Sequence, residues 1–560
     1  MISQKNTKII FWSISLITIG CLWFFQYVIT VNIPWWDDFH GIMLPVYHLF
    51  SDAPISEKLQ EFVSLNNEHR VVNDRLFNLA IYLIFGVFEM KTLAMLGFIN
   101  LILIFFVLYK VTRPYNANIL TYVPVIFLIF NAQYFESLQS LMVPFQNFSV
   151  IFYVFLSLYF LLYYPKNGFK LSFLFAIIAL FTHGNGILML VLGALILLVK
   201  KKYKNLGIWI ALSVILVFVY FLGYNKPAWN PNVSPTEHPL QAFLYVFEFL
   251  GSYALNITDT STGLTNSSLR VILPTALGLI IVILFTFFFL KKYTIISKNY
   301  ILYLNKLAHS KSDLFLTASI LFFLATGLLI GWTRTGFPMV SRYTINSHML
   351  IALVYLFLVQ NIKNNRSFIV AASGFSFFML VLSYYNNLDE GIMKRKNAET
   401  DGLNWRYSGT WANQYFIPKH VELLNPLLTE MYQTNDYVFP KNELEDYRTL
   451  HVEPKSTTFI TDQTNDILSI EAIYPLKNDL CEAHGLYFSI ENEVVSFIFP
   501  AKHRRNNPMQ LLKQKSFYDS NVKASFPLFL VPKGTYKLFE IQYTKDSIRK
   551  FETGKTISNF

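Results

Sequence analysis

Long apolar runs, separated by short polar breaks, fill roughly the first 385 residues of the chain. A helix that crosses a bilayer needs about 20 apolar residues, within a range of about 17–25. The runs that clearly reach this length are 9–30, 92–109, 143–164, 206–224, 270–290, 313–331, 344–361 and 367–384. Shorter or interrupted apolar segments are 76–88, 119–130, 169–182 and 186–199, with an aromatic segment suited to the interface at 240–257. We therefore predict an α-helical polytopic membrane protein with about 11–13 transmembrane helices.

The pattern changes after the last of these runs. Residues 419–432 have the composition of a helix, whereas 486–490 and 494–499 alternate apolar and polar positions. Such alternation, bounded by turn residues such as those at 533–534, predicts β-strands. The chain is thus expected to have a transmembrane part, 1–385, and a small α+β or β-rich soluble domain, 386–560.

Composition supports the membrane assignment and explains the positive charge. Apolar residues make up 53% of the chain and charged residues 14%, whereas a soluble domain has about 25% charged residues. A net charge of +11 can indicate nucleic-acid binding. Here the Lys and Arg residues concentrate in short breaks between apolar runs, at 200–204, 291–298 and 363–366. That is the pattern of cytoplasmic loops, so we expect the lipid bilayer as a partner and no nucleic acid.

The basic loops also predict the orientation of the chain. If 200–204, 291–312 and 361–366 are cytoplasmic, together with the N-terminus, then 31–75 and everything after residue 384 lie outside. We therefore expect a multi-pass protein of the cytoplasmic membrane with an extracytoplasmic C-terminal domain. Because successive spans must cross in alternate directions, one of the apolar segments cannot be a full span. We predict that 76–88 is this segment and forms a short or re-entrant helix; another of the short segments is the alternative.

Two adjacent acids follow the first predicted span. Trp35 and Trp36 suit the aromatic belt at the lipid boundary, so Asp37 and Asp38 are expected at the membrane surface. Adjacent carboxylates raise one another's pKa, and a pair at this place favours a functional role. The alternative is a helix cap followed by a solvated loop.

The same outer loop later carries Glu68, His69, Arg70 and, just before the next apolar segment, Arg75. Arginine presents a planar fork of donors that matches phosphate or carboxylate oxygens. These residues are candidates for substrate binding. The alternative is the start of an interfacial helix with local ion pairs.

Other predicted outer loops add four candidates. Glu136 is the only charged residue in 131–147, and Arg334 and Arg342 lie in 332–343. Positive charge outside opposes the usual inside bias, which favours a ligand or an ion pair for these arginines. His183 ends another outward helix, where a lone histidine is often an ordinary hydrogen-bonded group.

Several familiar chemistries are missing from the sequence. It contains no phosphate-binding loop of the Gly-rich Lys-Ser/Thr type, no Cys/His cluster with zinc spacing, no His-Glu-x-x-His and no Gly-x-Ser-x-Gly. We therefore expect no cofactor, and nothing in the sequence indicates a metal.

The arrangement resembles the GT-C superfamily of integral membrane glycosyltransferases. The shared features are one span, a long outer loop that opens with acids, a short second helix, an acid-bearing second outer loop and a soluble C-terminal domain. The resemblance covers roughly 1–385 and rests on short motifs. It implies catalytic acids at Asp37 or Asp38 and at Glu136, and a residue near the lipid phosphate at His183, where the family has Lys or Arg.

The expected function is transfer of a sugar from a polyprenyl-phosphate donor to a glycan or lipid acceptor of the bacterial cell envelope. A carboxylate would act as general base, with Asp38 slightly favoured, and Arg342 with Arg70 or Arg75 would hold the phosphate. The outer-loop candidates should then converge on one cavity. A polysaccharide polymerase or ligase is an alternative, as is a flippase or transporter, although mid-membrane charges are scarce.

Overall fold

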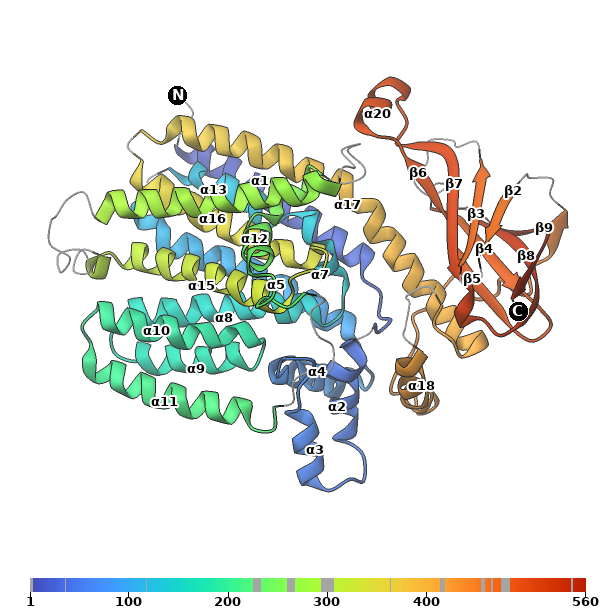
Figure 1. The fold of residues 1–560 in the computed structure, drawn as a ribbon, viewed down its shortest axis with the longest axis horizontal. Helices are drawn as coiled ribbons and strands as arrows, with labels where there is room; N and C mark the ends of the chain where they lie inside the picture. Colours follow the sequence, from blue (N-terminus) through green and yellow to red (C-terminus); the bar gives the residue numbers. More distant parts are fainter. Residues whose placement is uncertain are drawn as a thin grey trace.

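The computed structural model consists of a bundle of helices with a β-rich domain at one end (Figure 1). Among the predicted features, Trp36 and the basic residues Lys298 and Lys363 lie outside the part of the chain that the structure describes. The structure describes residues 4–35, 37–116, 118–224, 233–258, 267–293, 307–362, 364–412, 418–454, 459–464, 467–474, 484–544 and 547–559.

Nine helices of the described residues are long and apolar enough to cross a membrane, which indicates a multi-pass membrane protein. All eight apolar runs that clearly have spanning length form such helices, as predicted. The ninth is Ile119–Gln139, which contains the short helices α6 (Val123–Ile129) and α7 (Phe135–Gln139). The eight are α1 (Gln4–Ile29), α5 (Met90–Thr112), α8 (Val143–Tyr163), α11 (Tyr203–Phe221), α13 (Ser267–Tyr293), α15 (Lys311–Thr333), α16 (Thr344–Asn361) and α17 (Arg366–Ser408).

Shorter apolar helices account for the difference from the predicted 11–13 spans. They are α9 (Gly168–Leu180), α10 (Leu188–Val199) and α12 (Pro239–Leu250). The aromatic segment expected at the interface forms α12, which packs against α13 and α15. The segment 76–88 gives α4 (Val72–Phe85), 14 residues long, which is too short to be among the nine.

The first long loop is compact and packs against the C-terminal region. It contains the π-helical turn η1 (Phe39–Met43), α2 (Leu44–His48) and α3 (Ile55–Phe62). Phe39 is fully buried, with its ring centroid 6.0 Å from that of Trp411. A hydrophobic core of its own therefore fixes this loop against the chain that follows α17.

The C-terminal domain contains two β-sheets, in agreement with the predicted β-rich character. The strands and helix predicted at 486–490, 494–499 and 419–432 are confirmed as β4, β5 and α18 (Pro418–Gln433). One sheet has the order β1 (Val452–Pro454), β9 (Ile548–Asn559), β8 (Gly534–Tyr543), β4 (Leu486–Glu491) and β5 (Ser496–Pro500). The other has the order β2 (Phe459–Gln463), β3 (Ile467–Ile473), β7 (Tyr518–Pro527) and β6 (Lys502–Arg505).

Helix α17 joins the bundle to this domain without interruption. It is 43 residues long, and the predicted boundary at 385/386 falls inside it. Near its C-terminal end the Asn404 amide bonds the backbone of Ile498 in β5 through both its nitrogen and its oxygen, at 3.0 and 2.8 Å. The N-terminus and the α10–α11 connection lie at the end of the bundle away from the domain (Figure 1).

A matched pair of glycines tests the packing of α12 on α13. A Cβ added at Gly278 in α13 would lie 2.0 Å from the carbonyl oxygen of Phe247, whereas one at Gly374 in α17 would meet nothing within 4 Å. Gly278→Ala should therefore lower the free energy of unfolding of the detergent-solubilised protein by about 1–3 kcal/mol, and with it the melting temperature. Gly374→Ala should leave it unchanged or raise it. Equal melting temperatures for the two variants would contradict the packing.

Candidate functional site

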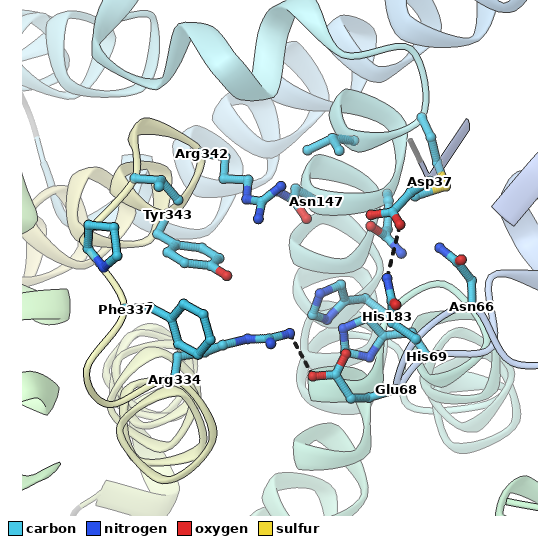
Figure 2. Close-up of a pocket in the computed structure, with 16 residues that line it drawn as sticks. Asp37, Asn66, Glu68, His69, Asn147, His183, Arg334, Phe337, Arg342 and Tyr343 are labelled. Atoms are coloured by element: carbon cyan, nitrogen blue, oxygen red, sulfur yellow. Dashed lines mark hydrogen bonds and ion pairs between the residues drawn. The ribbon is translucent and has the colours of Figure 1, made fainter. Parts of the chain in front are cut away.

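Six of the predicted site residues line one polar cavity of about 250 Å³ (Figure 2). We call it the polar cavity. Its other walls include Asn66, Asn67, Asn147, Phe337 and Tyr343. The six predicted residues are Asp37, Glu68, His69, His183, Arg334 and Arg342. The end of α15, which carries one of them, points toward the C-terminal domain (Figure 1).

A tight turn at residues 66–69 forms one wall of this cavity. The backbone N–H of Asn66 donates to the carbonyl of His69 at 2.7 Å, and that of His69 donates back at 3.0 Å. Asn67 has a φ of +52°, a left-handed conformation that asparagine tolerates better than most residues. Its side-chain amide donates to Oδ1 of Asp37 at 3.0 Å (Figure 2). The turn thus fixes Asp37 and directs Glu68 into the cavity.

An ion pair closes the cavity between two loops that are far apart in sequence. Nη2 of Arg334, at the C-terminal end of α15, donates to Oε1 of Glu68 at 2.6 Å (Figure 2). The side chains are 16% and 23% exposed. Partial burial strengthens such a charge-assisted hydrogen bond, so the pair holds the first loop against the α15–α16 connection.

Two histidines in the lining of the cavity pack against each other, with their ring planes tilted by 35°. The ring centroids of His69 and His183 are 4.0 Å apart, and Nδ1 of His183 lies 2.8 Å from Oδ1 of Asn185. Burial, with Arg334 nearby, lowers the pKa of His69 to about 4. Burial and the neighbouring His69 hold the pKa of His183 well below its usual value. Both rings are therefore neutral at pH 7, so His183 can offer a phosphate a hydrogen bond but no charge.

Asp38 occupies a different environment from its neighbour. Its side chain is almost fully buried, and its two oxygens accept from the backbone N–H groups of Trp35 and Met142 at 2.9 and 3.0 Å. Burial raises the pKa of this carboxyl to about 7 against the opposing effect of these hydrogen bonds. Asp38 lines a second cavity of about 290 Å³ rather than the polar cavity.

Glu136 lies between the two cavities. It lines the second one, where it forms an ion pair with Lys394 of α17. Its Oε2 accepts from the backbone N–H of Arg342 at 3.3 Å. Lys394 was not among the predicted site residues, although it belongs to a basic run at 394–396 beyond the last predicted span.

Arg70 and Arg75 lie outside both cavities. The Arg70 guanidinium donates to the carbonyls of Val63, Tyr220 and Leu222. The Arg75 guanidinium donates to four backbone carbonyls, those of Gly41, Glu61, Phe62 and Ser64. Arg75 thus ties the first loop together, whereas Arg70 ties that loop to the end of α11. The structure thus brings six of the ten predicted site residues together at the polar cavity. Asp38 and Glu136 line the second cavity, and Arg70 and Arg75 line neither.

No family model, curated protein or solved structure matches this chain. Within the part of the chain that the structure describes, no group of three or more His, Cys, Asp or Glu side chains is arranged to hold a metal ion. The side chains that line the two cavities are therefore the main indication of function.

The histidine pair predicts a dependence of stability on acid. The pKa of His69 is about 4 in the folded protein and 6.5 in an unfolded chain, so between these values only the unfolded chain binds the proton. Stability should fall as the pH drops from about 6.5 to about 4. His69→Gln cannot titrate and should lose less stability over that range, measured by thermal unfolding in detergent. His238→Gln, at an exposed site, should behave like the wild type. An identical acid loss in His69→Gln would contradict the assignment.

Proposed function

We propose that this protein is a membrane glycosyltransferase that moves a sugar from a polyprenyl-phosphate donor to an acceptor hydroxyl in the polar cavity. The observation that supports this most directly is that Asp37 of the first loop converges with Arg334 and Arg342 of the α15–α16 connection on one cavity of an apolar bundle. A lipid-linked donor keeps its phosphate at the membrane surface. The loops that line this cavity are expected at the same depth, because they follow directly on the apolar helices.

The reaction requires a proton acceptor and a group that stabilises the leaving phosphate. The acceptor hydroxyl forms a bond to the anomeric carbon, the bond from that carbon to the phosphate oxygen breaks, and the hydroxyl proton passes to a base. Asp37 suits this role because it lines the cavity with one oxygen fixed by Asn67. In Asp38 both oxygens already accept backbone hydrogen bonds, so we assign it to anchoring the loop.

The phosphate is assigned to the arginines of the cavity. Arg342 lines the polar cavity and forms no salt bridge with a carboxylate among the described residues. Arg334, in contrast, forms an ion pair with Glu68. A guanidinium keeps its proton at any physiological pH and offers two parallel donors to phosphate oxygens. Arg70 and Arg75 are left out of the proposal because they lie outside both cavities and their guanidinium groups donate to backbone carbonyls.

Glu136 is assigned a positioning role rather than direct proton transfer. It accepts from the backbone of Arg342 and pairs with Lys394, so it holds the phosphate-binding residue in place. The second cavity, with Val31, Ile33 and Leu141 among its apolar walls, adjoins this position and suits the apolar end of a lipid-linked substrate.

Removing the proposed base should nearly abolish transfer. Asp37→Asn keeps the shape of the side chain and most hydrogen bonding, but it cannot accept the proton. The rate of transfer from a polyprenyl-phosphate sugar, measured with protein in nanodiscs, should fall by about 10²–10⁴-fold with little change in KM. Asp52→Asn, an exposed acid of the same loop, is the matched control and should keep full activity. Wild-type transfer by Asp37→Asn would refute the assignment of Asp37 as the base.

Changing the proposed phosphate ligand should act on donor binding. Arg342→Lys preserves the charge but loses the planar fork, so KM for the donor should rise by about tenfold, equivalent to about 1.4 kcal/mol. Arg366→Lys, an exposed arginine at the start of α17, should leave KM unchanged. Reconstitution in sealed vesicles distinguishes a flippase, which would move labelled donor across the bilayer without consuming it.

A further inference from the structure

The connection between β6 and β7, residues 506–517, exposes large apolar side chains. It contains α20 (Pro508–Gln514), on which Met509 and Leu512 are 63% and 79% exposed, and it ends with Phe517 at 47%. Residues three apart share one face of a helix, so Met509 and Leu512 project together. Single exposed apolar residues are ordinary, whereas a cluster of them marks a contact with something else.

Internal hydrogen bonds hold this loop in shape. Asn507 and Gln510 cap α20 reciprocally. The backbone N–H of Asn506 donates to the carbonyl of Phe517 at 2.9 Å, and its side-chain amide donates to the carbonyl of Ser516 at 2.9 Å. The apolar side chains are thus presented outward by a closed loop.

The loop is attached to α17 immediately after its apolar run. The Tyr385 hydroxyl donates to the carbonyl of Asn506 at 2.6 Å, and the ring centroids of Tyr385 and Phe517 are 5.8 Å apart. The guanidinium of Arg505 lies 4.7 Å from the Tyr385 ring centroid. Tyr385 directly follows the predicted span 367–384, the position at which aromatic residues mark a lipid boundary.

The exposed surface of α17 gives the level of that boundary. The apolar side chains exposed on it run from Val370, at 65%, to Val381, at 52%, and the buried amide of Asn386 follows. At about 1.5 Å of rise per residue, Tyr385 lies about 6 Å beyond Val381. Figure 1 shows α20 at the part of the domain nearest the bundle. The loop is therefore level with the point where α17 leaves the apolar layer.

Basic residues accompany the apolar ones. Lys513 and Lys515 are exposed at the end of α20, and the Arg504 side chain is 66% exposed. Apolar side chains flanked by Lys and Arg are typical of segments that bind the interface of an anionic bilayer.

We propose that the 506–517 loop is a membrane-surface anchor of the C-terminal domain. Met509 and Leu512 enter the headgroup region beside α17, and Lys513 and Lys515 contact anionic headgroups. This rests on α17 crossing the membrane and is independent of the transfer reaction.

Lipid-borne quenching tests the anchor in the full-length protein. In a background of Cys21→Ser and Cys481→Ser, a polarity-sensitive fluorophore is attached to Leu512→Cys or to Val494→Cys. Val494 is a matched control because it is equally exposed, at 78%, in the β4–β5 turn of the same domain. Its neighbour Ser496 bonds Ser408 at the far end of α17, roughly 40 Å along the helix from Val381.

The proteins are reconstituted in vesicles of equal parts phosphatidylcholine and phosphatidylglycerol that carry a nitroxide lipid. The label at residue 512 should emit at shorter wavelength and lose most of its fluorescence, whereas the label at 494 should keep it. Equal behaviour at the two positions would overturn the proposal. A 512 label protected from both the nitroxide lipid and aqueous iodide would also overturn it, because a protein surface would then cover the loop. Equal quenching in phosphatidylcholine alone would refute the headgroup contact of the lysines.

Discussion

An ionised side chain is costly in the hydrocarbon core of a bilayer, and this cost governs where charge lies in the described bundle. At the end nearest the β-rich domain, Glu68 pairs with Arg334 and Glu136 with Lys394. At the other end, Lys292 at the end of α13 pairs with Asp313 at the start of α15, at 2.7 Å. Ion pairs thus lie at both ends of the long helices, and at the end nearest the β-rich domain the charged side chains also line the two cavities.

The same constraint makes the long helices predictable from sequence and the short ones less so. An apolar run of spanning length identifies a helix without knowledge of its neighbours, which is why all eight clear runs were found. The span Ile119–Gln139 is different because Gln133 interrupts it. Gln133 is buried there because its amide bonds the carbonyl of Ser252 at 3.0 Å and the ring of His348 at 2.9 Å. Partners so distant in sequence leave no local signal.

The candidate site shows a similar division between what local sequence contains and what packing decides. Charge in predicted outer loops was enough to identify the four charged residues that line the polar cavity, Asp37, Glu68, Arg334 and Arg342. It could not distinguish Arg342, which lines that cavity, from Arg75, which binds four backbone carbonyls. Nor could it separate Asp37 from Asp38, since adjacent residues reach different cavities only once the turn between helix α1 and η1 is formed.

Helix α17 places the site and the C-terminal domain on one continuous element. Lys394 on this helix pairs with Glu136, which in turn accepts from the backbone of Arg342. One and a half turns earlier, the nearly buried carboxylate of Asp389 bonds the Tyr518 hydroxyl of β7 at 2.5 Å. Lys394 and Asp389 lie on the same helix, so contacts along α17 connect the polar cavity to the β-rich domain. Among the described residues, the domain contributes none to the lining of that cavity. The domain therefore meets the site through α17 rather than through side chains of its own.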